Sequence, residues 1–137
     1  MDKLQDLLRE SRRGVLVTIK RDGRPQLSNV SYALVDDVIR ISVTDGRAKT
    51  RNLARDPRAS FHVTNETFGT YVVAEGTATL SEVAAEPHDD AVNELVELYR
   101  VVAGEHPDWD EYRAAMIADK RRVVRIPVER VYGLAMD

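Results

Sequence analysis

Residues 15–44 constrain the fold most strongly, because apolar and polar side chains alternate along them and two tight turns interrupt the alternation. Asp22-Gly23 is a strong β-hairpin signal, and Asp36-Asp37 marks a second short turn. Strands joined by such short turns pair antiparallel, since a parallel connection needs about a dozen residues or more. The strands predicted in this segment are residues 15–20, 25–35 and 38–44. The fold is therefore expected to begin as an antiparallel sheet.

The rest of the 137-residue chain adds strands and short helices. Gly76 lies inside a long predicted strand and indicates a bulge or a close approach of backbone. Further strands are predicted at residues 58–64, 70–81, 121–126 and 128–134. Helices are predicted at residues 2–12, from Arg47 to Asp56-Pro57, between Asp89 and Gly104, and from Asp108 onward. We predict a single domain over residues 1–137, mainly β (α+β): a small antiparallel barrel with peripheral helices, not a parallel Rossmann-type sheet.

The composition excludes several classes of protein. With 43% hydrophobic and 31% charged residues, the chain is typical of a globular protein. Its apolar runs are far shorter than the roughly 20 residues that a membrane-spanning helix needs. The N-terminus lacks the apolar core of a signal peptide, so we expect a cytoplasmic location. Because the chain has no cysteine, disulfides, thiolate metal sites and cysteine nucleophiles are excluded.

Charge is unevenly distributed along the chain. The net charge of −3 argues against a nucleic-acid-binding protein, which would need a broad cationic face. Basic residues are concentrated in residues 47–58 and 121–125, whereas acidic residues gather in residues 82–111. This segregation favours a small anionic ligand over a polyanion.

The segment 42–60 predicts where such an anion binds. The end of a strand is followed by a turn at Asp45-Gly46 and then by a short basic helix. The first turn of that helix carries Arg47, Lys49, Thr50 and Arg51. Unpaired N–H groups at a helix start, the positive end of the helix dipole and nearby cations together form an anion site. The sequence therefore predicts a phosphate-binding corner, with Arg51 either part of it or paired with Asp45 or surface glutamates.

The remaining polar residues give no catalytic pattern. His62 lies in a strand, and His88 and His106 lie in acidic loops without paired metal-ligand spacing, so we expect no metal site. The serines lack a nucleophile-elbow motif. Tyr32 and Tyr71 are candidates for a proton donor, although burial or a subunit contact is favoured for both. The catalytic residues therefore stay unassigned.

Two segments resemble a known family: GRPQLSNV at Gly23–Val30 and RAKTRNLARDPRAS at Arg47–Ser60. Both are similar to the flavin and deazaflavin split β-barrels related to pyridoxamine-phosphate oxidase, in particular to the actinobacterial branch that binds the deazaflavin coenzyme F420. The branch is also matched by VAEGTATL at Val73–Leu80, AGEHPDWDEYR at Ala103–Arg113 and VERVYGL at residues 128–134. The resemblance covers nearly the whole chain and implies a split barrel of the type that binds flavin mononucleotide (FMN).

The resemblance also implies a homodimer with two cofactor sites at the subunit interface, a small-molecule substrate, and no nucleic-acid or membrane partner. The cofactor-binding residues that it implies are Gln26, Ser28, Asn29, Ser42, Arg47, Ala48, Lys49 and Thr50. Arg47 stands where related flavin oxidases commonly have a serine. This additional cation fits the longer, anionic phospholactyl-glutamate tail of F420, and FMN is the alternative cofactor. The chain has no counterpart of the tail with which the true oxidases bind pyridoxal phosphate.

The implied activity is that of an F420-dependent reductase. Reduced F420 would deliver a hydride to an electron-poor alkene, imine or carbonyl of a small hydrophobic substrate. An FMN-dependent oxidoreductase of the same fold is one alternative. A non-catalytic module that binds or stores F420 is another, which the absence of an identifiable acid–base pair favours.

Overall fold

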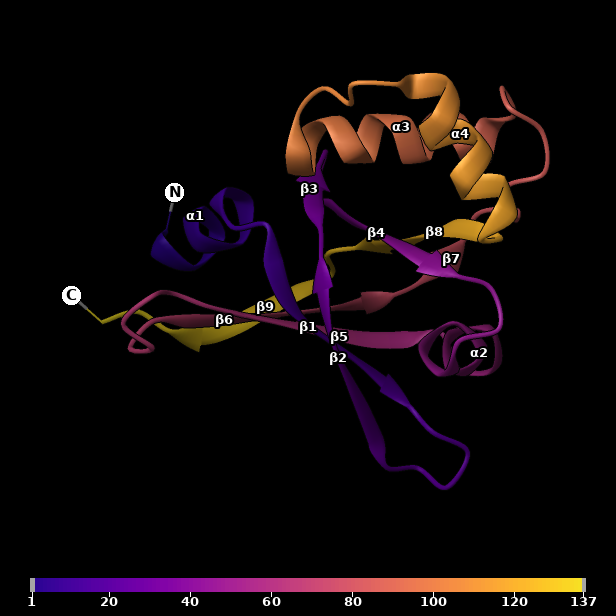
Figure 1. The fold of residues 1–137 in the computed structure, drawn as a ribbon. Coiled ribbons are helices and arrows are strands. Elements are labelled where there is room, and N and C mark those ends of the chain that lie inside the picture. The colour runs from indigo at the N-terminus through magenta and orange to yellow at the C-terminus, as the bar shows by residue number, and fades with distance from the viewer. Residues whose placement is uncertain (1, 137) are drawn as a thin grey trace.

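Two antiparallel sheets form the centre of residues 2–136, the part of the chain that the computed structural model describes (Figure 1). The five-stranded sheet contains, in spatial order, β2 (Pro25–Ser31), β1 (Arg13–Ile19), β5 (Arg58–Thr64), β6 (Tyr71–Thr77) and β9 (Arg130–Leu134). The four-stranded sheet contains β3 (Ala33–Val35), β4 (Val38–Thr44), β8 (Arg121–Pro127) and β7 (Thr79–Leu80). The pairings between these strands are antiparallel. The predicted fold class is thereby confirmed.

Four helices of the described chain surround the sheets: α1 (Lys3–Glu10), α2 (Ala48–Arg55), α3 (Asp90–Ala103) and α4 (Trp109–Ala118). Helices α3 and α4 lie together over the four-stranded sheet, whereas α1 and α2 lie at opposite ends of the molecule (Figure 1). The side chains of Asp89 and Asp108 accept hydrogen bonds from the first turns of α3 and α4, which confirms both predicted helix starts. No helix in residues 2–136 combines enough length and apolar character to cross a lipid bilayer.

The main core lies between the two sheets. Leu16 of β1 and Phe61 of β5 are fully buried there, and the ring of Phe61 meets that of Tyr32 with 4.6 Å between centroids. On β4, Ile39, Ile41 and Val43 are buried in this core. Burial of this apolar surface is the main force that holds the sheets together.

The four-stranded sheet is covered on its second face as well. There Val123 of β8 packs against Val92, Leu95 and Val96 of α3. The half-buried residues Arg40, Ser42 and Thr44 of β4 alternate with the core residues and so lie on this second face. These polar side chains form a layer between β4, β8 and α3.

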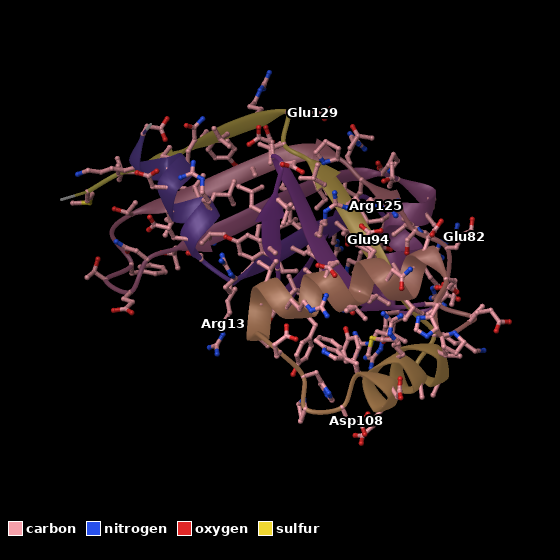
Figure 2. All side chains as sticks on the ribbon, turned by 90° about the horizontal axis from the view of Figure 1, so that it is seen from above. Arg13, Glu82, Glu94, Asp108, Arg125 and Glu129 are labelled. Atoms are coloured by element: carbon pink, nitrogen blue, oxygen red, sulfur yellow. The ribbon has the colours of Figure 1, made fainter. Side chains whose placement is uncertain are left out.

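Glu94 of α3 fastens the helix to this layer. Its carboxylate accepts hydrogen bonds from the guanidinium groups of Arg40 on β4 and Arg125 on β8. Figure 2 shows Glu94 and Arg125 side by side. Burial opposes ionisation of Glu94, but the hydrogen bonds and charges of Arg125 and then Arg40 outweigh it and lower the pKa of the carboxyl. We call these three residues the Glu94 clamp.

Two of the seven predicted strands are each divided between the sheets, so the number predicted was too low and residues 2–136 contain nine strands. The predicted strand 25–35 breaks at Tyr32, whose backbone N–H donates to Arg12 and whose hydroxyl donates to Leu8. The predicted strand 70–81 breaks at Ala78, whose N–H donates to the Pro57 carbonyl over 2.7 Å. In both places the chain crosses from one sheet to the other.

Gly76 sits just before the second crossing, and its predicted role in a close approach of backbone is confirmed. A Cβ atom built on Gly76 would lie 2.2 Å from the carbonyl oxygen of Pro127 on β8. Real Cβ contacts are not that short, so any side chain here would force β6 and β8 apart. The glycine therefore permits the two sheets to meet at this end of the barrel.

Candidate functional site: a cationic corner at the start of α2

The predicted phosphate-binding corner forms where β4 ends and α2 begins. Thr44 ends the strand, Asp45 and Gly46 make the turn, and α2 starts at Ala48 with Arg47 at its N-cap position. No side chain of the described residues caps the first N–H groups of the helix. These groups, at the positive end of the helix dipole, are therefore available to an anion.

Three cationic side chains gather at this helix start, and we call Arg47, Lys49 and Arg121 the cation corner. Arg121 is the first residue of β8 and pairs across the sheet with Thr44, the last residue of β4. Burial, and then the positive charges of Arg47 and Arg121, lower the pKa of Lys49 below its ordinary value. Like charges held this close repel one another, so the corner is electrostatically prepared for an anion.

The acidic residue of the turn does not neutralise the corner. Asp45 instead pairs with Arg122, over 3.1 Å, and Arg122 also donates to the Ser81 carbonyl. The alternative in which Arg51 pairs with Asp45 is therefore not what the structure shows. Within residues 2–136, no carboxylate forms an ion pair with a member of the cation corner.

Two residues of α2 hold the corner in shape. Thr50 is buried, and its hydroxyl donates to the Thr44 carbonyl over 3.0 Å, which ties the helix to the end of β4. Asn52 is also buried, and its amide donates to Thr18 on β1 and to the Gln26 side chain on β2, each over 3.1 Å. Asn52 was not predicted as a site residue, because nothing in the local pattern distinguishes it from an exposed helix position.

The strand residues that were predicted to bind the cofactor lie on three different faces. Gln26 and Ser28 are half-buried on the inner face of β2, and Gln26 contacts α2 through Asn52. Asn29 is exposed on the opposite face of β2, as alternation predicts. Ser42 faces the α3–α4 layer, with its hydroxyl 3.5 Å from Nη1 of Arg121. The structure thus places Gln26 beside α2 and Ser42 beside Arg121. Asn29 lies away from both.

Asn29 belongs to the outer face of the five-stranded sheet, which faces away from the core. Strand register places on this face Leu27, Asn29, Val15, Val17, Ile19, His62, Tyr71, Tyr132 and Leu134. Leu27 is 63% exposed, and Tyr132 and Leu134 are each about half exposed. A hollow on this face is lined by Asn29 and His62. Three large apolar side chains, Leu27, Tyr132 and Leu134, are thus exposed on one face of the sheet.

The tyrosines and histidines have separate surroundings. Tyr32 is buried in the core, where burial raises the pKa of its hydroxyl, so it is removed from any ligand. Tyr71 stacks on His62 on the outer face, with 5.6 Å between ring centroids. His106 accepts a hydrogen bond from the Asp108 backbone and joins an aromatic cluster with Trp109. The described residues contain no cluster of histidine and carboxylate side chains that could hold a metal ion.

Comparison with known proteins places the chain in a family. Among solved structures, a conserved hypothetical protein from Mycobacterium tuberculosis is 30% identical over 97% of this chain and 84% of its own, with a TM-score of 0.73. A structure described as an F420 reductase has a TM-score of 0.73 and 20% identity, over 96% of this chain and 98% of its own.

A haem-binding protein from Mycobacterium smegmatis has a TM-score of 0.68 and 23% identity, over 93% of this chain and 50% of its own. At identities below 25%, these last two similarities show the fold alone. Residues 1–135 match the family model for pyridoxamine 5'-phosphate oxidase. A match over this length shows that the chain belongs to the pyridoxamine 5'-phosphate oxidase family.

Proposed function

We propose that the protein is an F420-dependent reductase that transfers a hydride from reduced F420 to an electron-poor alkene, imine or carbonyl of a small substrate. The observation that carries this proposal is the cation corner at an uncapped helix start. Its three cations have no carboxylate partner among the described residues, so they suit an anionic cofactor. The deazaflavin ring supplies the hydride when F420 is bound.

The charge of the corner supports F420 over FMN. FMN ends in one phosphate, whereas the phosphate of F420 continues into a tail that carries carboxylates. Arg47 and Lys49 flank the free N–H groups at the start of α2 and would hold the phosphate there. Thr50 would shape the site through its bond to Thr44. Gln26 and Ser28, on the strand that Asn52 links to α2, would orient the ring.

The outer face of the five-stranded sheet supports a homodimer. Its exposed apolar residues would be buried against a second copy of the chain, which would exclude water from a site at the interface. Asn29 and Tyr71 would then approach the cofactor that the partner subunit holds. Tyr71 and solvent are the proton sources that this arrangement offers. Sedimentation velocity tests this step, since a monomer at micromolar concentration would contradict it.

The experiment that tests the function is an assay of reduced F420 with a panel of activated alkenes, imines and carbonyl compounds. Oxidation of the cofactor is followed by absorbance, with reduced FMN as the parallel cofactor. Turnover with F420 that is lost in Lys49→Ala supports the proposal, whereas turnover with FMN alone assigns the protein to the flavin enzymes. Tight F420 binding without turnover of any substrate would instead favour a storage module.

A further inference from the structure

Arg121 differs from its neighbour Arg122 in what its guanidinium contacts. Arg122 is fully engaged, with hydrogen bonds to the Ser81 carbonyl and to Asp45. The Nε atom of Arg121 is buried and has no hydrogen-bond partner within residues 2–136. Its Nη1 atom makes one long contact, 3.5 Å, with the Ser42 hydroxyl. A buried donor without a partner is costly, so the fold holds Arg121 in a position that it would not otherwise favour.

Arg121 reaches the cation corner from β8, a strand far from α2 in the sequence. It lies at the start of β8 beside Thr44, and its side chain is on the face of the sheet that α3 and α4 cover. Its charge acts both on Lys49 of α2 and on Tyr112 of α4. Its guanidinium lies beside Ser42 on this face, next to the end of β4 that Thr50 ties to α2.

We propose that Arg121 binds a second anionic group of the ligand, a carboxylate in the tail that follows the phosphate. This inference rests on the proposed function, because it assumes that the phosphate occupies the start of α2. A planar guanidinium whose terminal Nη atoms have no carboxylate partner within the described residues can donate two parallel hydrogen bonds to one carboxylate, which a lysine cannot. Arg121 would thus make the site selective for cofactors with an anionic tail over those that end in a phosphate.

The test measures cofactor affinity by fluorescence titration with two ligands that share one ring. The first is F420, and the second is the same deazaflavin carrying only a terminal 5'-phosphate. We expect Arg121→Gln to weaken F420 binding about tenfold, as for loss of a charge-assisted hydrogen bond, and to change binding of the phosphate form less than about twofold. Arg121→Lys should recover only part of the lost F420 affinity, because a lysine restores the charge without the two parallel N–H donors of a guanidinium.

Two controls keep the result interpretable. Arg21→Gln removes the same charge from an exposed hairpin turn and should leave both affinities unchanged. An unchanged melting temperature shows that Arg121→Gln is folded. Equal weakening of both ligands would make Arg121 a phosphate contact and overturn the inference. No effect of Arg121→Gln on F420 binding, while Lys49→Ala still weakens it, would overturn the inference as well. If the wild-type protein binds neither ligand, the proposed function fails and this inference fails with it.

Discussion

Arg121 of the cation corner lies on the same face of β4 and β8 as the Glu94 clamp, yet it has no carboxylate partner in the described chain whereas the arginines of the clamp share one. At one end of the strands, Arg40 and Arg125 share the carboxylate of Glu94. At the other end, Arg121 has a buried donor without a partner in residues 2–136, and its charge helps to lower the pKa of Lys49. The first group is complete within the fold and stabilises it. The second group lacks a counter-charge within residues 2–136, which is the property expected of a site that binds an anion.

Removal of Glu94 should have the largest effect on stability. Glu94→Ala leaves two partly buried guanidinium groups without a counter-charge, which should cost about 3 kcal/mol of unfolding free energy. Urea unfolding measures this loss. Cofactor affinity of the remaining folded protein should stay within about twofold, since the clamp does not contact the corner. Lost affinity at full stability would reverse the roles assigned to the two groups.

Removal of Lys49 should weaken cofactor binding without lowering stability, which is the opposite of the effect expected for Glu94. Lys49→Ala should weaken F420 binding by about ten- to a hundredfold, because it removes a charge-assisted contact to the phosphate. Stability should be unchanged or slightly higher, since the substitution relieves repulsion from Arg47 and Arg121. Fluorescence titration and urea unfolding of the same preparation separate the two effects. A large loss of stability would mean that Lys49 is a structural residue.

The pH dependence sharpens the comparison further. Because burial and neighbouring cations lower the pKa of Lys49 in the folded state, the unfolded chain binds more protons between that lowered value and 10.5. The contribution of Lys49 to stability therefore rises with pH in this window. F420 affinity should fall in the same window, as Lys49 loses its charge. The pH slope of stability and the pH slope of F420 affinity, each measured relative to Lys49→Ala, should therefore have opposite signs. Slopes of the same sign would refute this account.

The smallest effect is expected at Arg51, which lies one helical turn beyond Arg47. Its side chain is exposed, and Asp45 is paired with Arg122 instead. Arg51→Gln should therefore change F420 affinity less than about threefold, as for an ordinary surface charge. A tenfold loss in the titration would extend the cation corner along α2.

Local features of the fold were predictable from the sequence, whereas contacts between distant segments were not. The strands 38–44 and 58–64 have the predicted bounds, because alternation and turn residues act within a few positions. The crossings at Tyr32 and Ala78 depend on carbonyl groups of Leu8 and Pro57, which no local pattern reveals.

The candidate site divides in the same way. Residues 47–50 form a continuous segment, so their chemistry could be identified from the sequence. The second basic segment, residues 121–125, was visible as well. The alternation of side chains along this segment could not show that Arg125 is paired with Glu94 while Arg121 is not. The reason is that the partners come from helices and strands far away in the chain.

The central claim, that the start of α2 holds the cofactor phosphate, is tested most directly by an NMR titration of ¹⁵N-labelled protein with F420. Anions that accept hydrogen bonds from a helix N-terminus perturb the amide resonances of the first turn. We predict the largest shifts at the backbone amides of Ala48, Lys49 and Thr50, with little change at Glu94. Shifts centred elsewhere, or none at saturating F420, would contradict the claim.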